Sequence, residues 1–412
     1  MQIEQTDVNI DQQVKQQRKV WLVLILGSLT AFGPLSLDMY LPGLPEVTSD
    51  LNATASLGQI SITTCLLGLA FGQLLFGPLS DMHGRRKPLI MTLLLFALFS
   101  LLSGLSNHIW LFIILRVFQG LTGAAGIVIA RASARDMYAG KDLTQFIALL
   151  AIVNGAAPIL APIFGGIILK WMTWKAVFYV LSIIGLVMFL TVLIFLPETL
   201  PKEKRMDGNV FAMYKSFGTL FKDRIFLGIS FGQSFISMAM FAYIAASPFV
   251  LQNIYHISPQ QFSIIFAVNG LGIVIAAQVA GRLTHHFAEM TILHIGITMA
   301  FIGSVLLMFV VFVNLALWVI IIALFMVVSS VGLVNTTSFS LAMNRQGKIA
   351  GSASAFLGVL PFAGGALVSP LVGIAGENSA VPMGLVIFVC CTLAFVTLGW
   401  IKSYEKRAEQ VT

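Results

Sequence analysis

Long apolar stretches alternate with short polar segments along the whole chain. Six stretches occupy the first half, and six more follow a longer polar interval. A membrane-spanning helix needs about 20 mainly apolar residues, and each stretch approaches or exceeds this length. The pattern predicts an all-α membrane protein with twelve transmembrane helices, near residues 20–44, 57–80, 88–106, 109–134, 143–169, 174–196, 225–252, 260–284, 290–313, 316–343, 348–373 and 380–401.

The polar interval between the two sets of stretches predicts two six-helix bundles. The expected organisation is a cytoplasmic tail, a bundle, a cytoplasmic linker, a second bundle and a second cytoplasmic tail, at 1–19, 20–196, 197–224, 225–401 and 402–412. Weak internal repetition supports this division. Gly77 aligns with Gly281 at an offset of 204, and Gly155 aligns with Gly358 at an offset of 203. The halves are therefore expected to share a fold.

Composition supports a membrane protein. Hydrophobic residues make up 58% of the chain and charged residues only 10%, whereas a soluble domain carries roughly 25% charged residues. The segment 1–17 is polar and lacks the apolar core of a secretory signal, so the first stretch is expected to remain as a span. The cysteines Cys65, Cys390 and Cys391 lie within apolar stretches and are expected to be buried thiols without disulfides.

The distribution of lysine and arginine predicts the orientation. With a cytoplasmic N-terminus, 21 of the 24 basic residues fall in cytoplasmic segments, as the positive-inside rule requires. Both termini are therefore expected in the cytoplasm. The net charge of +7 is spread over many loops, which disfavours a nucleic-acid surface because such a surface needs clustered basic residues.

Two charged residues lie deep within predicted spans. Asp38 is in the first span and Arg116 is in the fourth, and both are expected about 9–11 Å below the outer boundary. A charge at such depth is costly, so these residues should face protein or a water-filled cavity. Burial favours a protonated Asp38, and a close Arg116 favours the carboxylate. One interpretation is a proton carrier tuned by Arg116; the alternative is a fixed ion pair joining the two helices.

Other functional classes fit the sequence poorly. A primary pump would carry a phosphate-binding Gly-x-x-x-x-Gly-Lys-Ser/Thr loop, and the sequence has none. A metal site is not expected, since His285 and His286 are adjacent and no cysteine is near. An intramembrane enzyme would need paired catalytic groups at one depth, and a channel would need rings of like groups. No cofactor is expected, and an enzyme remains a remote alternative.

One loop carries a recognisable signature between the second and third spans. It reads Gly77-Pro-Leu-Ser-Asp81-Met-His-Gly84-Arg85-Arg86-Lys87. This resembles the loop 2–3 motif of the major facilitator superfamily, and the resemblance implies two pseudo-symmetric six-helix bundles. It also implies that the motif stabilises one state of the transport cycle. As a conformational latch, Asp81 is expected to contact the start of span eleven and Arg131 or Arg135, with Met82 replacing the usual basic residue.

Three further stretches narrow the resemblance. Arg116, Gln119, Gly120 and Gly123 resemble the span-four motif of proton-coupled drug exporters, and small residues there suit close helix packing. The span-five antiporter motif is matched by Gly155, Pro158, Pro162, Gly165 and Gly166, with Ala161 in place of the usual glycine. The segment Asp38-Met-Tyr40-Leu-Pro42-Gly-Leu-Pro45 resembles the span-one signature of the Bcr/CflA multidrug-resistance transporters.

The resemblance implies efflux of small drugs in exchange for protons across the cytoplasmic (inner) membrane. The partners implied are a drug, a proton and the lipid bilayer, with a functional monomer. Related exporters carry a second acid earlier in span one, but Leu29, Thr30 and Ala31 occupy that region, so neutral or weakly charged substrates are expected. Proton-coupled import of a metabolite stays the nearest alternative.

Polar and aromatic residues near the middle of spans are candidates for substrate contact. Each of them could instead make a hydrogen bond between helices. They are Tyr40, Asn154, Tyr243, Asn269 and Asn335.

Overall fold

The computed structural model describes most of the 412 residues as a bundle of long helices. Described are residues 21–138, 140–205, 220–221, 223–313, 316–345, 350–374, 376 and 379–411, without the side chains of a few of these positions. The predicted tail at 1–19 and most of the linker at 197–224 lie outside this part of the chain. Within it the chain forms helices and connecting turns, and no strand occurs. The all-α prediction is therefore confirmed.

The helices follow the order that the apolar stretches predict. Before the linker they are Trp21–Thr30, α2 (Phe32–Asp38), η1 (Leu41–Gly43), α3 (Leu44–Asp50), α4 (Ala55–His83), α5 (Arg86–Leu105), α6 (Ile109–Met137), α7 (Gly140–Ile168) and α8 (Trp174–Phe195). After it they are α10 (Arg224–Phe249), η3 (Val250–Ile254), α11 (Pro259–Leu283), α12 (Glu289–Val313), α13 (Leu317–Arg345), α14 (Ala350–Val368), η5 (Ser369–Gly373) and α15 (Val381–Val411). A short η2 (Lys202–Lys204) lies between the sets.

The span count agrees with the predicted order. Ten described helices are each long and apolar enough to cross a membrane, and the bent pair Trp21–Thr30 and Phe32–Asp50 makes an eleventh span. The helix α7 occupies the place of the predicted fifth span. Two features differ from the prediction. The first span is broken at Ala31 with a bend of 41°, and α15 continues to Val411, well past the expected end of the last span.

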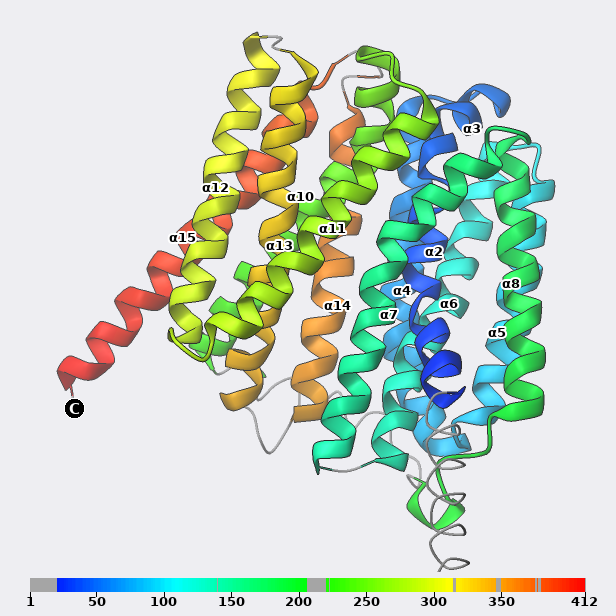
Figure 1. Cartoon of the computed structure of the whole chain (residues 1–412), viewed down its shortest axis with the longest axis horizontal. Coiled ribbons are helices and arrows are strands. Elements are labelled where there is room, and N and C mark those ends of the chain that lie inside the picture. The colour runs from blue at the N-terminus through cyan, green and yellow to red at the C-terminus, as the bar shows by residue number, and fades with distance from the viewer. Residues whose placement is uncertain are drawn as a thin grey trace, which may run out of the picture.

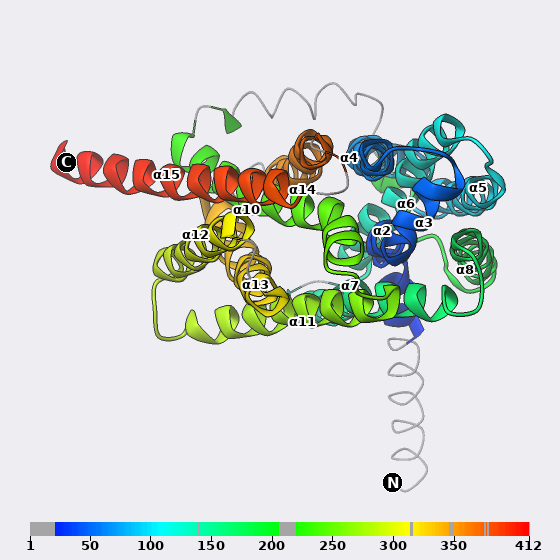
Figure 2. The same cartoon turned by 90° about the horizontal axis from the view of Figure 1, so that it is seen from above.

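The helices form two groups that meet along two pairs of helices. Figures 1 and 2 show α2 to α8 on one side and α10 to α15 on the other, with α7 beside α11 and α14 beside α4. Of the two repeated glycine pairs, Gly155 and Gly358 lie at these meeting places, whereas Gly77 lies near Val128 of its own group and Gly281 has no atom within 4 Å of an added methyl group. A methyl group on Gly155 would come within 3.3 Å of Val274 of α11, and one on Gly358 would come within 3.3 Å of Gln73 of α4. The repeat therefore preserves small residues where the two groups cross.

Glycines also bring α4 and α6 together within the first group. Side chains on Gly68 or Gly72 would collide with backbone atoms of α6, and one on Gly120 would collide with the carbonyl of Cys65 in α4. Such close backbone approach is the usual role of small residues between membrane helices. The expectation of tight packing around Gly120 is confirmed.

Hydrogen bonds between the two groups gather at one end of the molecule. We call this end, which carries Gly43, Trp174 and Gly373, the far end; the basic end carries Arg85 and Arg205. Within the described residues, three side chains donate to backbone carbonyl oxygens across the interface, all at the far end. They are Ser56 to Gly373 at 2.8 Å, Gln252 to Pro42 at 3.0 Å and Gln260 to Gly166 at 3.1 Å.

Candidate functional site

A cavity of about 150 Å³ lies between the two groups of helices. Its walls come from α2 and α7 on one side and from α10, α11, α13 and α14 on the other. Most of the wall is apolar, with three polar side chains. The lining residues are Gly33, Pro34, Leu37, Asp38, Pro158, Met240, Phe241, Tyr243, Ile244, Phe266, Asn269, Gly270, Ile273, Val328 and Phe362. A mainly apolar pocket with a few convergent polar groups is the usual form of a small-molecule site.

Asp38 contributes the acid of this cavity. It is the last residue of α2, just before the chain passes into the short 3-10 helix that begins at Leu41. The change from α2 to the 3-10 helix therefore places the carboxyl at a helix end. Asp38 is only 5% exposed, and its Oδ1 atom has no hydrogen-bond partner among the described residues. The sequence predicts that this acid faces protein or a water-filled cavity, and in the structure it is a buried residue of the cavity lining.

Tyr243 and Asn269 face the same cavity from the second group. The Nδ2 atom of Asn269 donates a hydrogen bond of 2.8 Å to the Tyr243 hydroxyl. The Tyr243 ring stacks on Phe266, with ring centroids 5.5 Å apart. Asn269 is 1% exposed, and its Oδ1 atom has no partner in the part of the chain described. The pair is thus held firmly, while Oδ1 of the amide is left without a hydrogen bond in that part of the chain.

Arg116 lies in an aromatic cluster of the first group. Its guanidinium is completely buried and sits 4.3 Å from the centre of the Tyr40 ring. Its Nη1 donates to Gln119, which in turn donates to Ser100 at 2.8 Å. The contacts described for Arg116 therefore do not include the direct meeting with Asp38 that the equal depths suggested. A fixed ion pair between these two residues is not what the structure shows.

The other predicted substrate contacts have different positions. Tyr40 is fully buried, bonds Ser61 at 3.1 Å and lies against Arg116, so it is not part of the cavity wall. Asn335 is on α13 but is not among the lining residues. The side chain of Asn154 lies outside the described residues. Of the five candidates, the structure brings Tyr243 and Asn269 together at the cavity.

The proposed antiporter motif lies where α7 meets both the first span and the second group. Pro158 lines the cavity, and both it and Pro162 are within the helix. Gly165 lies directly against the backbone of Met39, which follows Asp38, so a side chain there would collide with the Met39 carbonyl. Gly166 packs against Ser263 of α11. This segment therefore connects the Asp38 region with the opposite group of helices.

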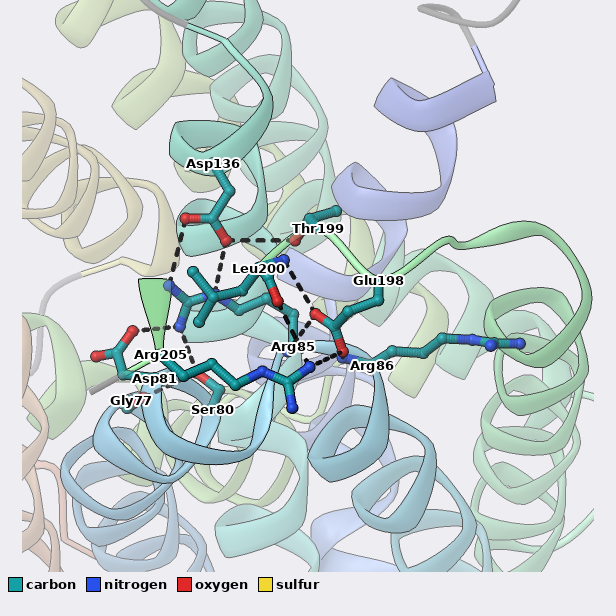
Figure 3. A network of polar contacts seen from close by, with 10 residues as sticks. All are labelled: Gly77, Ser80, Asp81, Arg85, Arg86, Asp136, Glu198, Thr199, Leu200 and Arg205. Carbon is teal, nitrogen blue, oxygen red and sulfur yellow. Dashed lines mark hydrogen bonds and ion pairs between the residues drawn. The ribbon is translucent and has the colours of Figure 1, made fainter. Parts of the chain in front are cut away.

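A second polar cluster surrounds Arg85 at the basic end. Figure 3 shows the guanidinium of Arg85 between Asp81 and Asp136. Nε donates to Asp136 at 2.8 Å, and Nη1 donates to Ser80 at 2.8 Å and to Asp81. Burial disfavours the charged form, but the bonds and charges of Asp136 and Asp81 outweigh this and raise the pKa of Arg85 above its ordinary value. The cluster thus ties the end of α4 to the end of α6.

Glu198 ties the start of the linker to the same loop. Its carboxylate accepts hydrogen bonds from the backbone N–H groups of Arg85 at 2.8 Å and Arg86 at 3.3 Å, and it pairs with Arg205 at 3.7 Å (Figure 3). An acid at the start of α5 also suits the positive end of the helix dipole. Gly84 has a φ of +88°, and a side chain there would strike Glu198 and Arg205. The motif glycine therefore permits both the turn and this contact.

The predicted latch is only partly reproduced. Asp81 contacts Arg85 of its own loop, and contacts with Arg131 or Arg135 do not occur among the described interactions. The side chains at the start of α14 lie outside the described residues, so the expected contact there stays a prediction. The Arg86 side chain donates to the carbonyl of Leu193 on α8, and Gly77 faces Val128 at ordinary contact distance. Sequence reasoning missed Asp136 and Glu198. Their only signal was that each is an acid close to a predicted inner membrane boundary.

Comparison with known proteins identifies the family. The family model described as "Major Facilitator Superfamily" matches residues 26–370. The chain belongs to the major facilitator superfamily.

Two relatives of this major facilitator match over nearly their full lengths. An uncharacterized MFS-type transporter, YdgK, of Bacillus subtilis (strain 168) is 44% identical, over 92% of this chain and 94% of the relative. A bicyclomycin resistance protein homolog of Haemophilus influenzae is 30% identical, over 95% of this chain and 98% of the relative. The fold agrees with the crystal structure of a D-xylose-proton symporter, with a TM-score of 0.73 at 15% identity, covering 93% of this chain and 96% of that one.

These findings confirm the predicted family and class. The major facilitator architecture and the relationship to drug-resistance transporters are as expected from the loop 2–3 motif. The protein is a membrane transporter and not an enzyme, and it is a multi-pass protein of the inner membrane. Its interbundle cavity, lined by one acid, one amide and one phenol among mainly apolar residues, is the candidate site for the molecule transported.

Proposed function

We propose that this major facilitator exports small drug molecules in exchange for protons, with Asp38 as the proton carrier. The observation that carries the proposal is the position of Asp38. Among the residues that line the described cavity it is the one acid, it is buried, and its Oδ1 has no hydrogen-bond partner in the part of the chain that the structure describes. A carboxyl in an apolar cavity between two bundles can bind a proton, which neutralises it, and it can also bind a ligand. Because both bind at the same group, binding of one weakens binding of the other.

Arg116 acts on this carboxyl from a distance. It is fully buried, and its Nε and Nη2 have no partner among the described residues. Tyr40, two residues after Asp38, packs on the guanidinium. A change in the segment that carries both Asp38 and Tyr40 would therefore alter the distance between the acid and the buried positive charge. This provides a physical route by which movement can change the affinity of Asp38 for a proton.

Alternating access supplies the movement. The three interbundle hydrogen bonds found among the described residues all lie at the far end, while the latch residue Asp81 at the basic end contacts its own loop. This arrangement supports a state that is closed at the far end. With both termini in the cytoplasm, as the basic residues favour, the far end faces outward and the state is inward-facing. We expect the transporter to act as a monomer, because the cavity is lined by residues of a single chain.

Transport in inside-out vesicles tests the proposal. Vesicles from cells that express the chain are given an acidic interior, and chloramphenicol uptake is compared with that in vesicles from cells carrying an empty vector. Proton–drug antiport predicts accumulation of unaltered drug that collapses when the pH gradient is dissipated. Movement in the opposite direction under the same gradient would indicate a symporter, and chemical alteration of the drug would indicate an enzyme.

A further inference from the structure

Two residues that line the cavity from opposite bundles each carry a buried hydrogen-bond acceptor. One is Oδ1 of Asp38 on α2, and the other is Oδ1 of Asn269 on α11. Both residues line the cavity, at 5% and 1% exposure, and neither oxygen has a hydrogen-bond partner in the described part of the chain. A buried polar atom without a partner carries a free-energy cost, which a bound ligand can relieve.

The Asn269 amide is held in place by Tyr243. The Tyr243 hydroxyl accepts the bond from Nδ2, and the Tyr243 ring is fixed by stacking on Phe266. One end of the amide is therefore occupied, and the other end is directed away from that bond. Gly270, the next residue, packs closely against Ile159 of α7, where a methyl group would come within 3.1 Å. The position of the amide relative to the first bundle is thus defined by packing on both sides.

We infer that Asn269 selects substrates that carry a hydrogen-bond donor. The inference rests on the proposed function and assigns a chemical class to its substrate. The ligand is a compact amphipathic molecule with an apolar body and at least two donors, hydroxyl or N–H groups. One donor meets Asp38 and a second meets Asn269, while the body contacts Phe241, Phe266 and Phe362 on the second bundle. The affinity for a ligand that bridges the two bundles in this way depends on the relative position of the bundles.

The alternative substrate class is a lipophilic ion without donors. Such an ion can bind to aromatic walls and to Asp38, but it leaves the Asn269 oxygen buried and unpaired. Sites built to bond a ligand donor reject analogues that lack it more strongly than apolar sites reject small changes of shape. A substitution at Asn269 should therefore weaken binding of the donor-bearing class and not of the lipophilic ions, whereas a substitution at a distant asparagine should affect neither class.

Binding to the purified full-length protein in detergent tests the inference. The probes are chloramphenicol, a neutral molecule with two hydroxyls and an amide N–H, and tetraphenylphosphonium, a cation with neither group. In Asn269→Leu, chloramphenicol affinity should fall about ten- to a hundredfold, because a ligand donor is left unpaired in the cavity. Tetraphenylphosphonium affinity should stay the same or rise. The control Asn335→Leu removes another asparagine of the second bundle and should change neither affinity.

Three results would overturn the inference. They are wild-type chloramphenicol affinity in Asn269→Leu, equal losses for both probes in that variant, and absence of chloramphenicol binding to the wild-type protein. The thermal unfolding of each variant in detergent shows whether it is folded. No proton gradient is present in this experiment, so its failure leaves the antiport proposal standing. A correct binding pattern without gradient-driven uptake in vesicles would instead count against antiport alone.

Discussion

The side-chain amide of Gln252 donates a hydrogen bond of 3.0 Å to the carbonyl oxygen of Pro42, four residues beyond Asp38. Gln252 belongs to the π-helical turn that ends the first span of the second bundle. Pro42 belongs to the 3-10 helix that follows Asp38. The far-end closure is therefore attached directly to the segment that carries the proposed proton site. Opening of the far end must break this bond and release that segment.

Removal of the Gln252 amide should favour opening at the far end. In Gln252→Ala, one of three described interbundle hydrogen bonds is lost, at a cost of about 1 kcal/mol to the closed state. Spin labels on cysteines introduced at exposed Ser49 and His256 report the separation of the bundles there. The native cysteines are buried and should not label. The variant should show a larger population at long distance than the wild type.

The control for this experiment is Gln278→Ala, which truncates an exposed glutamine of α11. It should leave the distance distribution unchanged. Identical distributions for Gln252→Ala and the wild type would show that the bond to Pro42 does not stabilise the closed far end.

Gly165 should not accept even a methyl group. In Gly165→Ala the new Cβ would collide with the carbonyl of Met39, so α7 or the Asp38 segment must move. Overpacking of this kind typically costs about 1–3 kcal/mol. We expect a lower thermal unfolding temperature in detergent and reduced drug efflux from cells. Gly281→Ala is the matched control, because no atom lies within 4 Å of the added methyl. Equal stability of the two variants would contradict the close contact.

Arg85 should not be replaceable by lysine. Its guanidinium bonds Asp136, Ser80 and Asp81 together, and a lysine ammonium cannot reproduce this planar arrangement. Arg85→Lys should reduce thermal stability, whereas Arg282→Lys, at an exposed arginine, should not. The pKa of Arg85 is raised above its ordinary value. The stabilisation of the folded protein by the charged Arg85 side chain is therefore lost only as the pH rises through that higher pKa. The stability difference should therefore be constant between about pH 6 and 9. A difference that disappears within this range would contradict the assignment.

The sequence predicted the helices well because membrane spans leave a strong local signal. The helix α5 was expected at 88–106 and is found at Arg86–Leu105, and α12 was expected at 290–313 and is found at Glu289–Val313. The break at Ala31 was not predicted, since that stretch remains apolar on both sides of it.

The candidate site could be predicted less completely. Asp38 and Arg116 could be predicted as functional candidates because a charge inside a membrane span is costly to bury. Their depth in the membrane could be predicted from their positions within the spans. Their partners depend on rotation about the helix axes, which depth does not define. Arg116 therefore turned out to contact Gln119 and Tyr40, and Asp38 to line the same cavity as Asn269. Asp136 and Glu198 resemble ordinary loop acids until the fold brings them to Arg85.

Proton release on drug binding tests the role of Asp38 most directly. Chloramphenicol is added to the purified protein in weakly buffered detergent solution at mildly acidic pH, and released protons are measured with a pH-sensitive dye. The wild type should release protons in proportion to the drug bound. Asp38→Asn should bind drug without releasing protons, and the control Asp50→Asn, at an acid bonded to Trp174 at the far end, should behave as the wild type. Equal proton release by Asp38→Asn and the wild type would contradict the assignment of Asp38 as the proton carrier.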